Sequence, residues 1–226
     1  MQYKEVSHVI FDMDGLLIDS EKLYTIGFQN VVSQFGKQYT WDLKVQLMGK
    51  QGRECADIVI KTLDLPISID EFIEETRKHF EVLFPTVALM PGAKRLVQHL
   101  QDNNIPFALA TSSSKENADL KIMNHRDLFD MFSHKIFGTS DPEVEKGKPE
   151  PDIFLVCASK FPDKPDPSNC LVFEDAPNGV KAGVAAGMQV VMVPDEQLDA
   201  ALTCEATLVL RSLEDFKPEL FGLPPF

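Results

Sequence analysis

Closely spaced cysteines and histidines are missing from this sequence of 226 residues. The four cysteines lie far apart with no CxxC pair, and the five histidines form no HxH or HExxH group. The usual signatures of cysteine or histidine metal sites and of redox pairs are therefore absent. Buried, reduced thiols in a cytoplasmic protein are the simplest interpretation of the cysteines.

Positive charge is also scarce. Lysine and arginine total 22 against 35 aspartates and glutamates, which gives a net charge of −13. This balance argues against a nucleic-acid polymer or an anionic membrane as partner, although a local group of cations can still bind a small anion. No apolar run is as long as a membrane span, and Asp12 and Asp14 interrupt the run near the N-terminus. We expect a soluble, cytoplasmic monomer.

Six short apolar runs have the composition of buried β-strands. They are rich in Val, Ile, Leu and Phe with little alternation, as expected for strands covered on both faces. They lie at residues 7–11, 105–110, 135–137, 170–173, 189–193 and 207–210. Helical patterns separate them. Strands that alternate with helices predict an α/β fold, a doubly wound, Rossmann-like parallel sheet.

The stretch between residue 20 and about residue 84 lacks a convincing strand pattern. Three helical patterns occur there instead. A stretch of about 65 residues is too long for an ordinary connection, so we expect a helical subdomain. We predict an α/β core formed by residues 1–18 and 86–226, with a helical cap, residues 19–85, inserted between its first two segments.

Polar side chains follow several of the predicted strands at the point where each strand ends. In an open parallel sheet, the carboxyl ends of the strands share one edge, and ligands bind there. We therefore expect one crevice to collect the strand-end side chains and a lysine from the connection before a helix. They are Asp12, Asp14, Thr111, Glu174, Asp175 and Lys148.

The acidic members of this group suit a metal ion. Asp12, Asp14 and Asp175 offer the hard oxygen ligands that Mg²⁺ prefers. Asp12 and Asp14 are two residues apart, so in extended chain their side chains point the same way. A carboxylate can attack phosphorus when a metal ion offsets the repulsion between like charges. A site for Mg²⁺ and a phosphate group therefore explains why carboxylates gather at the edge of an apolar core.

The remaining members suit the phosphate group. Thr111 and the backbone N–H of Ser112 lie near an expected helix start, which favours phosphate oxygens. Lys148, in the segment GKPEP, supplies a positive charge for a phosphoryl group in transfer. Solvated loop residues are the alternative interpretation, but the combination in this order favours a single site.

The ordered set resembles the four motifs of the haloacid dehalogenase-like hydrolases. These are DxDG at Asp12 after a strand, Thr111 after a second strand, Lys148 in GKP, and the pair Glu174 and Asp175 after a later strand. The helical insertion is placed where the β-phosphoglucomutase-like branch of that family carries its cap. The resemblance covers essentially the whole chain and implies a Mg²⁺-dependent phosphatase.

The resemblance also implies a role for each residue. Asp12 would be the nucleophile that forms an aspartyl-phosphate, and Asp14 would be the general acid and then the base that activates water. Asp12, Asp175 and Asp14, the last through its backbone carbonyl, would bind Mg²⁺, and Glu174 would support them. The residues implied in phosphate binding are Thr111, Ser112 and Lys148.

Longer segments resemble one group within this family, the eukaryotic pseudouridine-5'-phosphatases. Among them are FPTVALMPGA, SDPEVEKGKPEPDIF and CLVFEDAPNGVKAGVAAGMQVVMVPD. This resemblance implies hydrolysis of a small phosphorylated metabolite, with pseudouridine 5'-phosphate as the favoured substrate.

The cap offers candidates for substrate specificity near the segment YTWDLKVQLMGK. They are Gly49, Lys50 and Arg53, with solvated surface charge as the alternative for the two cations. Asp19 and Ser20, by contrast, are expected to act as the N-cap of the first cap helix.

Other functions remain open from the sequence. A phosphosugar mutase of the β-phosphoglucomutase type would return the phosphoryl group to another hydroxyl of the bound sugar. A sugar-phosphate or glycerol-phosphate phosphatase would use the same chemistry on another ester. A signalling receiver domain also holds an aspartate cluster and Mg²⁺, but its acidic groups come in another order and it has no use for the helical insertion.

Overall fold

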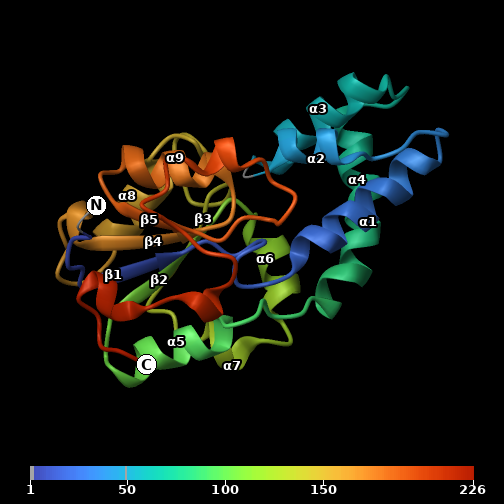
Figure 1. The fold of residues 1–226 in the computed structure, drawn as a ribbon. Coiled ribbons are helices and arrows are strands. Elements are labelled where there is room, and N and C mark those ends of the chain that lie inside the picture. The colour runs from blue at the N-terminus through green and yellow to red at the C-terminus, as the bar shows by residue number, and fades with distance from the viewer. Residues whose placement is uncertain (1–2, 49) are drawn as a thin grey trace.

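The computed structural model describes residues 3–48 and 50–226, and within them six parallel strands form one sheet (Figure 1). The strands are β1 (His8–Phe11), β2 (Phe107–Thr111), β3 (Lys135–Phe137), β4 (Cys170–Glu174), β5 (Gln189–Met192) and β6 (Leu208–Val209). Their spatial order is β3-β2-β1-β4-β5-β6, and Ile10 of β1 lies opposite Ala108 on one side and Val172 on the other. The predicted strands are confirmed, with ends that differ by at most two residues.

Both faces of the sheet are buried. Val9 and Phe11 of β1 belong to one apolar cluster and Ile10 to another, because successive residues of a strand face opposite sides. Figure 1 shows α5 and α7 on one side of the sheet and α8 and α9 on the other. The helices of the core are α5 (Ala93–Asp102), α6 (Lys115–Ile122), α7 (Arg126–Phe129), α8 (Asp152–Ser159) and α9 (Pro177–Ala185). This two-sided burial confirms the doubly wound α/β fold.

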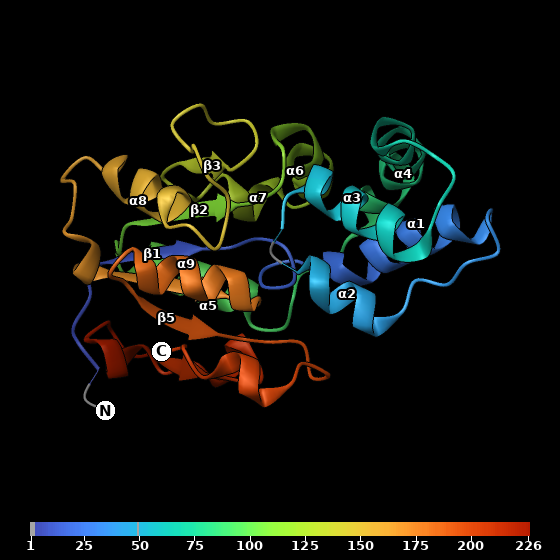
Figure 2. The ribbon, with the colours of Figure 1, turned by 90° about the horizontal axis from the view of Figure 1, so that it is seen from above.

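The sheet order creates a crevice at the carboxyl end of β1. From β1 the chain continues to β2 and β3 on one side, and then crosses to β4 on the other side of β1. Ligands bind at such a switch point, because the connections leave the strand in opposite directions. Seen from above, the helices of residues 20–83 lie beyond this end of the sheet (Figure 2).

These helices, together with a short 3₁₀ helix, are called the cap here. They are α1 (Ser20–Ser33), α2 (Trp41–Leu47), α3 (Gly52–Leu63), α4 (Ile69–Leu83) and η1 (Phe84–Thr86). The sequence predicted three helical patterns, and the described residues contain a fourth helix, α2. It spans seven residues, too few for a clear apolar repeat, and it begins where the Thr40 hydroxyl accepts a hydrogen bond from the N–H of Leu43.

The cap has an apolar cluster of its own, distinct from the two clusters of the sheet. Aromatic rings form much of it. Phe28 packs against Phe72 and Phe80, and Phe80 stacks on Phe84 with 4.5 Å between ring centroids. The cap helices are therefore held to one another by their own apolar contacts.

Four further 3₁₀ helices lie in the described C-terminal half. They are η2 (Pro167–Asn169), η3 (Ala200–Thr203), η4 (Leu213–Asp215) and η5 (Pro218–Phe221). Phe221 and Leu223 pack the tail against the cluster that contains Val9. Across residues 3–48 and 50–226, no helix combines the length and the apolar content needed to cross a membrane.

Candidate active site

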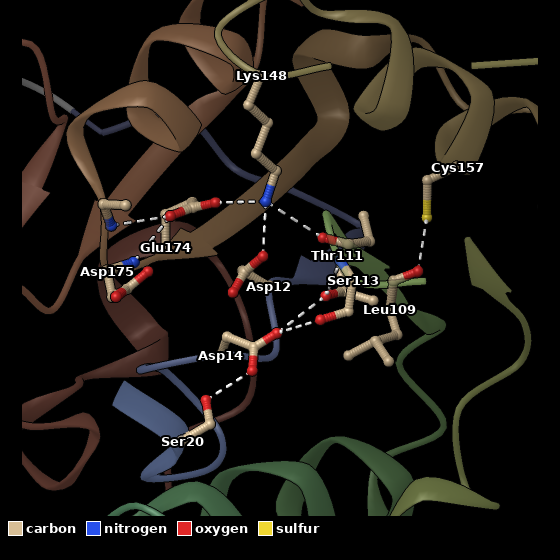
Figure 3. A network of polar contacts seen from close by, with 12 residues as sticks. Asp12, Asp14, Ser20, Leu109, Thr111, Ser113, Lys148, Cys157, Glu174 and Asp175 are labelled. Atoms are coloured by element: carbon tan, nitrogen blue, oxygen red, sulfur yellow. Dashed lines mark hydrogen bonds and ion pairs between the residues drawn. The ribbon is translucent and has the colours of Figure 1, made fainter. Parts of the chain in front are cut away.

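The ends of β1, β2 and β4 bring the predicted side chains together (Figure 3). Asp12 and Asp14 follow β1, Thr111 ends β2, and Glu174 ends β4. Lys148 reaches the same point from the connection between β3 and α8, with its ammonium between Asp12 and Glu174. Residues far apart in the sequence thus meet at the carboxyl end of the central strand.

Lys148 is the cationic centre of this group. Its Nζ lies 2.6 Å from Oδ1 of Asp12 and 2.6 Å from Oε1 of Glu174, and it also donates to the carbonyl of Ala110 at 3.4 Å. The residue is 5% exposed. Burial would lower the pKa of the ammonium, but the charges of Asp12 and Glu174 outweigh it and raise that pKa. Lys148 therefore stays charged.

Asp12 is ionised less easily than an ordinary aspartate. Burial raises its pKa to about 7, with the charges of Glu174 and Asp14 adding to the rise and Lys148 opposing it. Asp12 borders the cavity described below. Its carboxylate is thus poorly hydrated, held at one oxygen and accessible from the cavity.

Glu174 is fixed through both of its carboxylate oxygens. Its Oε2 accepts hydrogen bonds from the backbone N–H groups of Asp175 and Ala176, both at 2.9 Å. A Cβ atom at Gly179 would lie 1.8 Å from Oε1 of Glu174, so only glycine leaves room for this side chain. Glu174 consequently braces the turn that presents Asp175.

The carboxylates outnumber the cation, and a divalent metal ion would offset their charge. Within residues 3–48 and 50–226, no three acidic, histidine or cysteine side chains are grouped as metal ligands, so such an ion would rely on fewer side chains. Asp12, Glu174 and Asp175 are all buried beside the single ammonium of Lys148. Burial raises the pKa of Asp175 well above its usual range, and the charges of Glu174, Asp12 and Glu21 add to that rise. Mg²⁺ prefers carboxylate and carbonyl oxygens and keeps several waters, so two carboxylates and one backbone carbonyl suffice as protein ligands. Asp12, Asp175 and the Asp14 carbonyl are the residues that would hold it.

Asp14 has a separate set of partners. Its Oδ1 accepts from the Ser20 hydroxyl at 2.6 Å and from Nζ of Lys121 at 2.5 Å. Its Oδ2 accepts from the hydroxyls of Ser113 at 2.8 Å and Thr111 at 3.3 Å. Burial would raise the pKa of Asp14, but the charge of Lys121 and these hydrogen bonds lower it instead. Asp14 is therefore ionised, and four donors hold its carboxylate.

Two of these partners were missed or misassigned in the sequence. Ser20 and Asp19 were expected to cap α1, but neither side chain does so, and the buried Ser20 hydroxyl bonds Asp14 instead. Lys121 carries no motif. The one available signal was its position on the same face of α6 as Ala118 and Ile122, where an apolar residue is expected.

The serines after β2 divide their roles. Ser112, predicted to bind phosphate through its N–H, borders the cavity. Thr111 Oγ1 accepts from the N–H of Ser113 at 3.1 Å, which shapes the turn. The Ser114 hydroxyl accepts from the N–H of Asn117 at 3.3 Å and caps α6.

A cavity of about 520 Å³ lies between the sheet edge and the cap. Asp12, Asp14 and Asp175 line its core side. Aromatic and cationic residues of the cap line the opposite side, and these are Tyr24, Phe28, Tyr39, Phe72, Phe80, Lys44, Lys50, Arg53 and Arg77. Its volume and mixed lining suit a small organic ligand with an anionic end.

The predicted specificity residues of the cap lie on the wall of this cavity where they are described. Lys50 pairs with Glu54, and Arg53 donates to Asp70 at 2.8 Å, with both members of the second pair exposed. Gly49 lies outside the described residues. The placement leaves Lys50 and Arg53 free to exchange their surface partners for a ligand, because exposed pairs are weak.

Comparison with known proteins shows the family of this chain and supports its fold. Residues 6–187 match the haloacid dehalogenase-like hydrolase family. A Drosophila melanogaster protein named "Probable pseudouridine-5'-phosphatase" is 51% identical, over 99% of this chain and 96% of that protein. The Arabidopsis thaliana "(DL)-glycerol-3-phosphatase 2" is 47% identical, over 98% of this chain and 93% of the relative.

A solved structure supports the architecture. The β-phosphoglucomutase of Clostridium difficile superposes with a TM-score of 0.79, covering 95% of this chain and 94% of that one. The two sequences are 24% identical, so the likeness speaks for the fold alone.

Proposed function

We propose that this chain, which belongs to the haloacid dehalogenase-like hydrolases and is a phosphomonoesterase, hydrolyses pseudouridine 5'-phosphate. The reaction passes through an aspartyl-phosphate on Asp12. The single observation that carries the mechanism is the contrast between two neighbouring carboxylates. Asp12 faces Lys148 and the crowded acidic group, whereas Asp14 is held by Lys121 and three hydroxyls. Two carboxyl groups in such different surroundings suit two different roles.

The first step transfers the phosphoryl group to Asp12. The free carboxylate oxygen of Asp12 attacks phosphorus, and the bond from phosphorus to the ester oxygen breaks. Asp14, which is ionised in the ligand-free protein, takes up a proton when the phosphate dianion binds beside it, gives that proton to the departing alcohol oxygen and becomes a carboxylate again. Lys148 and the N–H of Ser112 stabilise the charge on the phosphoryl oxygens. The Thr111 hydroxyl, which donates to Asp14 in the ligand-free protein, turns to these oxygens when phosphate is bound.

The second step releases phosphate. Ionised Asp14, the form favoured by its hydrogen bonds here, takes a proton from a water molecule as that water attacks phosphorus. The bond from phosphorus to Asp12 breaks, inorganic phosphate leaves, and Asp14 is protonated again for the next substrate. Asp14 thus serves first as acid and then as base, and its protonation state is the same at the start and at the end of the cycle.

A divalent metal ion completes the proposal. Mg²⁺ held by Asp12, Asp175 and the Asp14 carbonyl would offset the repulsion between the carboxylates and the phosphate dianion. It would also favour the ionised form of Asp12, whose pKa burial raises to about 7. Glu174 would brace Asp175 rather than bind the ion, since the N–H groups of Asp175 and Ala176 occupy its Oε2.

The substrate assignment is supported by three observations. The Drosophila relative shares 51% of its residues with this chain across nearly the full length. The cavity of about 520 Å³ has room for a nucleoside monophosphate. Its cap side offers partly exposed aromatic rings, Tyr24 and Tyr39, for a base. We also propose that residues 19–85 act as a lid that closes over the bound ester and excludes water from the first step.

The first experiment measures Mg²⁺-dependent phosphate release from pseudouridine 5'-phosphate, uridine 5'-phosphate and glycerol 3-phosphate, with Asp12→Asn as the blank. Clear preference for the pseudouridine ester supports the assignment. Preference for glycerol 3-phosphate would instead support the activity for which the Arabidopsis relative is named. An isomerised sugar phosphate with little free phosphate would indicate a mutase, and undiminished release by Asp12→Asn would refute the mechanism.

A further inference from the structure

Lys121 is a buried charge that the mechanism so far does not use. It lies on α6 and is 0% exposed, although lysine is almost never fully buried unless it is paired. Its neighbours on the same face, Ala118 and Ile122, belong to the apolar cluster beneath the sheet. A lysine at such a position is costly to bury, so its contacts must offset that cost.

Three oxygen atoms surround the ammonium of Lys121, matching its three N–H groups. Nζ donates to Oδ1 of Asp14 at 2.5 Å, to the hydroxyl of Tyr24 at 2.7 Å and to the hydroxyl of Ser113 at 2.8 Å. The ring centroids of Tyr24 and Phe84 lie 4.6 and 4.7 Å from Nζ, within reach of cation–π attraction. The ammonium is thus held from several directions and ties directly to Asp14.

Asp14 is held as tightly from its other side. The hydroxyl of Ser20 shares Oδ1 with Lys121, and the hydroxyl of Ser113 bonds both Oδ2 of Asp14 and the ammonium. Asp14, Lys121 and Ser113 therefore form a closed ring of hydrogen bonds. Such a ring fixes the orientation of the carboxylate, whereas a single contact would leave it free to rotate.

The partners of Lys121 come from both connections between the core and the cap. Tyr24 lies in α1, the helix that leaves the core, and Phe84 lies in η1, where the chain returns. Helix α6 packs against η1. Lys121 consequently links the orientation of Asp14 to the seating of both cap connections.

We propose that Lys121 is a positioning residue that fixes the Asp14 carboxyl group where it delivers its proton to the leaving oxygen of the substrate. The proposal rests on the role of Asp14 as general acid in the proposed function. It predicts that loss of Lys121 harms reactions that need this proton and spares those that do not. Loss of a lysine that only stabilises the fold would slow both classes of reaction equally.

Two phosphate esters separate these cases in Lys121→Met. The leaving group of p-nitrophenyl phosphate departs without a proton, whereas the alkoxide of an alkyl ester needs one. The alkyl ester is pseudouridine 5'-phosphate or glycerol 3-phosphate, whichever the wild type hydrolyses. Release of the alcohol is followed in a single turnover with enzyme in excess, because this isolates transfer to Asp12. We expect roughly a 100-fold slower release from the alkyl ester and at most about a fivefold change for p-nitrophenyl phosphate.

Lys115→Met is the matched control. Lys115 lies on the same helix and forms an exposed pair with Asp119 at 2.6 Å, so the same substitution there should leave both rates at the wild-type level. Equal losses on the two esters in Lys121→Met, or no loss on either, would overturn the proposal. Absence of wild-type turnover with every ester would overturn the proposed function itself, and this inference with it.

Tyr24→Phe keeps the test decisive should Lys121→Met not fold. This variant removes one acceptor of the ammonium and retains the ring beside it. We expect the same selectivity at a smaller scale, about three- to tenfold slower release from the alkyl ester only, which matches the net loss of one typical hydrogen bond. An equal effect on both esters, or none, would count against Lys121 in the same way.

Discussion

Gly15 and the carboxylate of Asp175 occupy adjoining space. A Cβ atom built on Gly15 would lie 2.2 Å from Oδ2 of Asp175. Gly15 also has a φ of +74°, in the left-handed region that favours glycine. The glycine of DxDG thus serves two purposes, because it turns the chain after Asp14 and leaves room for the carboxylate of Asp175, which follows β4.

Gly15→Ala should weaken metal binding. The added methyl group must displace Asp175, and a displaced ligand or supporting group typically costs roughly 10- to 100-fold in metal affinity. The Mg²⁺ dependence of phosphate release measures this as a higher half-saturating concentration. Gly36→Ala is the control, since Gly36 has a φ of +69° and no described residue comes within 4 Å of its added Cβ. Equal effects in the two variants would show that backbone strain alone is responsible.

Without a bound metal ion, the free energy of unfolding should depend on pH because of the ionisation of Asp12. Burial raises its folded-state pKa to about 7 from the ordinary value of 3.8, so the folded state binds more protons than the unfolded chain between those values. The free energy of unfolding in EDTA should therefore fall as pH rises through this window, with the loss complete above about 7.

Asp12→Asn removes that contribution, so its unfolding free energy should fall less steeply over the same window. Urea unfolding at several pH values measures both slopes. Saturating Mg²⁺ should restore stability to the wild type near neutral pH and much less to Asp12→Asn, which has lost a ligand. Identical slopes for the two proteins in EDTA would contradict this account.

Lys148→Met should destabilise the protein strongly. It leaves Asp12 and Glu174 buried without a cation, and breaking a buried pair in this way costs roughly 3–5 kcal/mol. Urea unfolding checks the size of the loss. A second substitution, Glu174→Gln, should recover part of it by removing one unpaired charge. In the exposed pair of Lys160 with Glu143, Lys160→Met should barely move the unfolding midpoint.

Arg53→Met should raise KM for the preferred phosphate ester with little change in kcat. Arg53 borders the cavity, and its partner among the described residues is the exposed Asp70, so its guanidinium is available to a bound anion. Loss of one charge-assisted contact corresponds to about a tenfold rise in KM. Lys61→Met, on the same helix with an exposed pair to Asp57, should leave both constants unchanged. A fall in kcat with unchanged KM would place Arg53 in the chemical step instead.

Local patterns in the sequence predicted the positions of the strands and the residues that share the crevice. The apolar run before Asp12 predicted β1, because a strand buried on both faces needs apolar residues at every position. The order of DxDG, Thr111, Lys148 and the Glu174 pair predicted a shared crevice, because parallel strands bring their carboxyl ends to one edge. The short α2 escaped notice, since seven residues carry too little periodicity.

Tertiary structure alone decided the partners of each charge. Ser20 has the sequence position of a helix cap, yet the turn after Asp14 folds back and aims its hydroxyl at that carboxylate. In the sequence, Lys121 does not differ from any other lysine in a helix. In the folded chain, Tyr24 and Asp14, from segments about 100 residues away, accept hydrogen bonds from its ammonium. Sequence alone thus determined the fold and the family, because these follow from periodicity and motif order. Which carboxylate pairs with which lysine depends on long-range packing, because it alone brings these distant side chains within hydrogen-bonding distance.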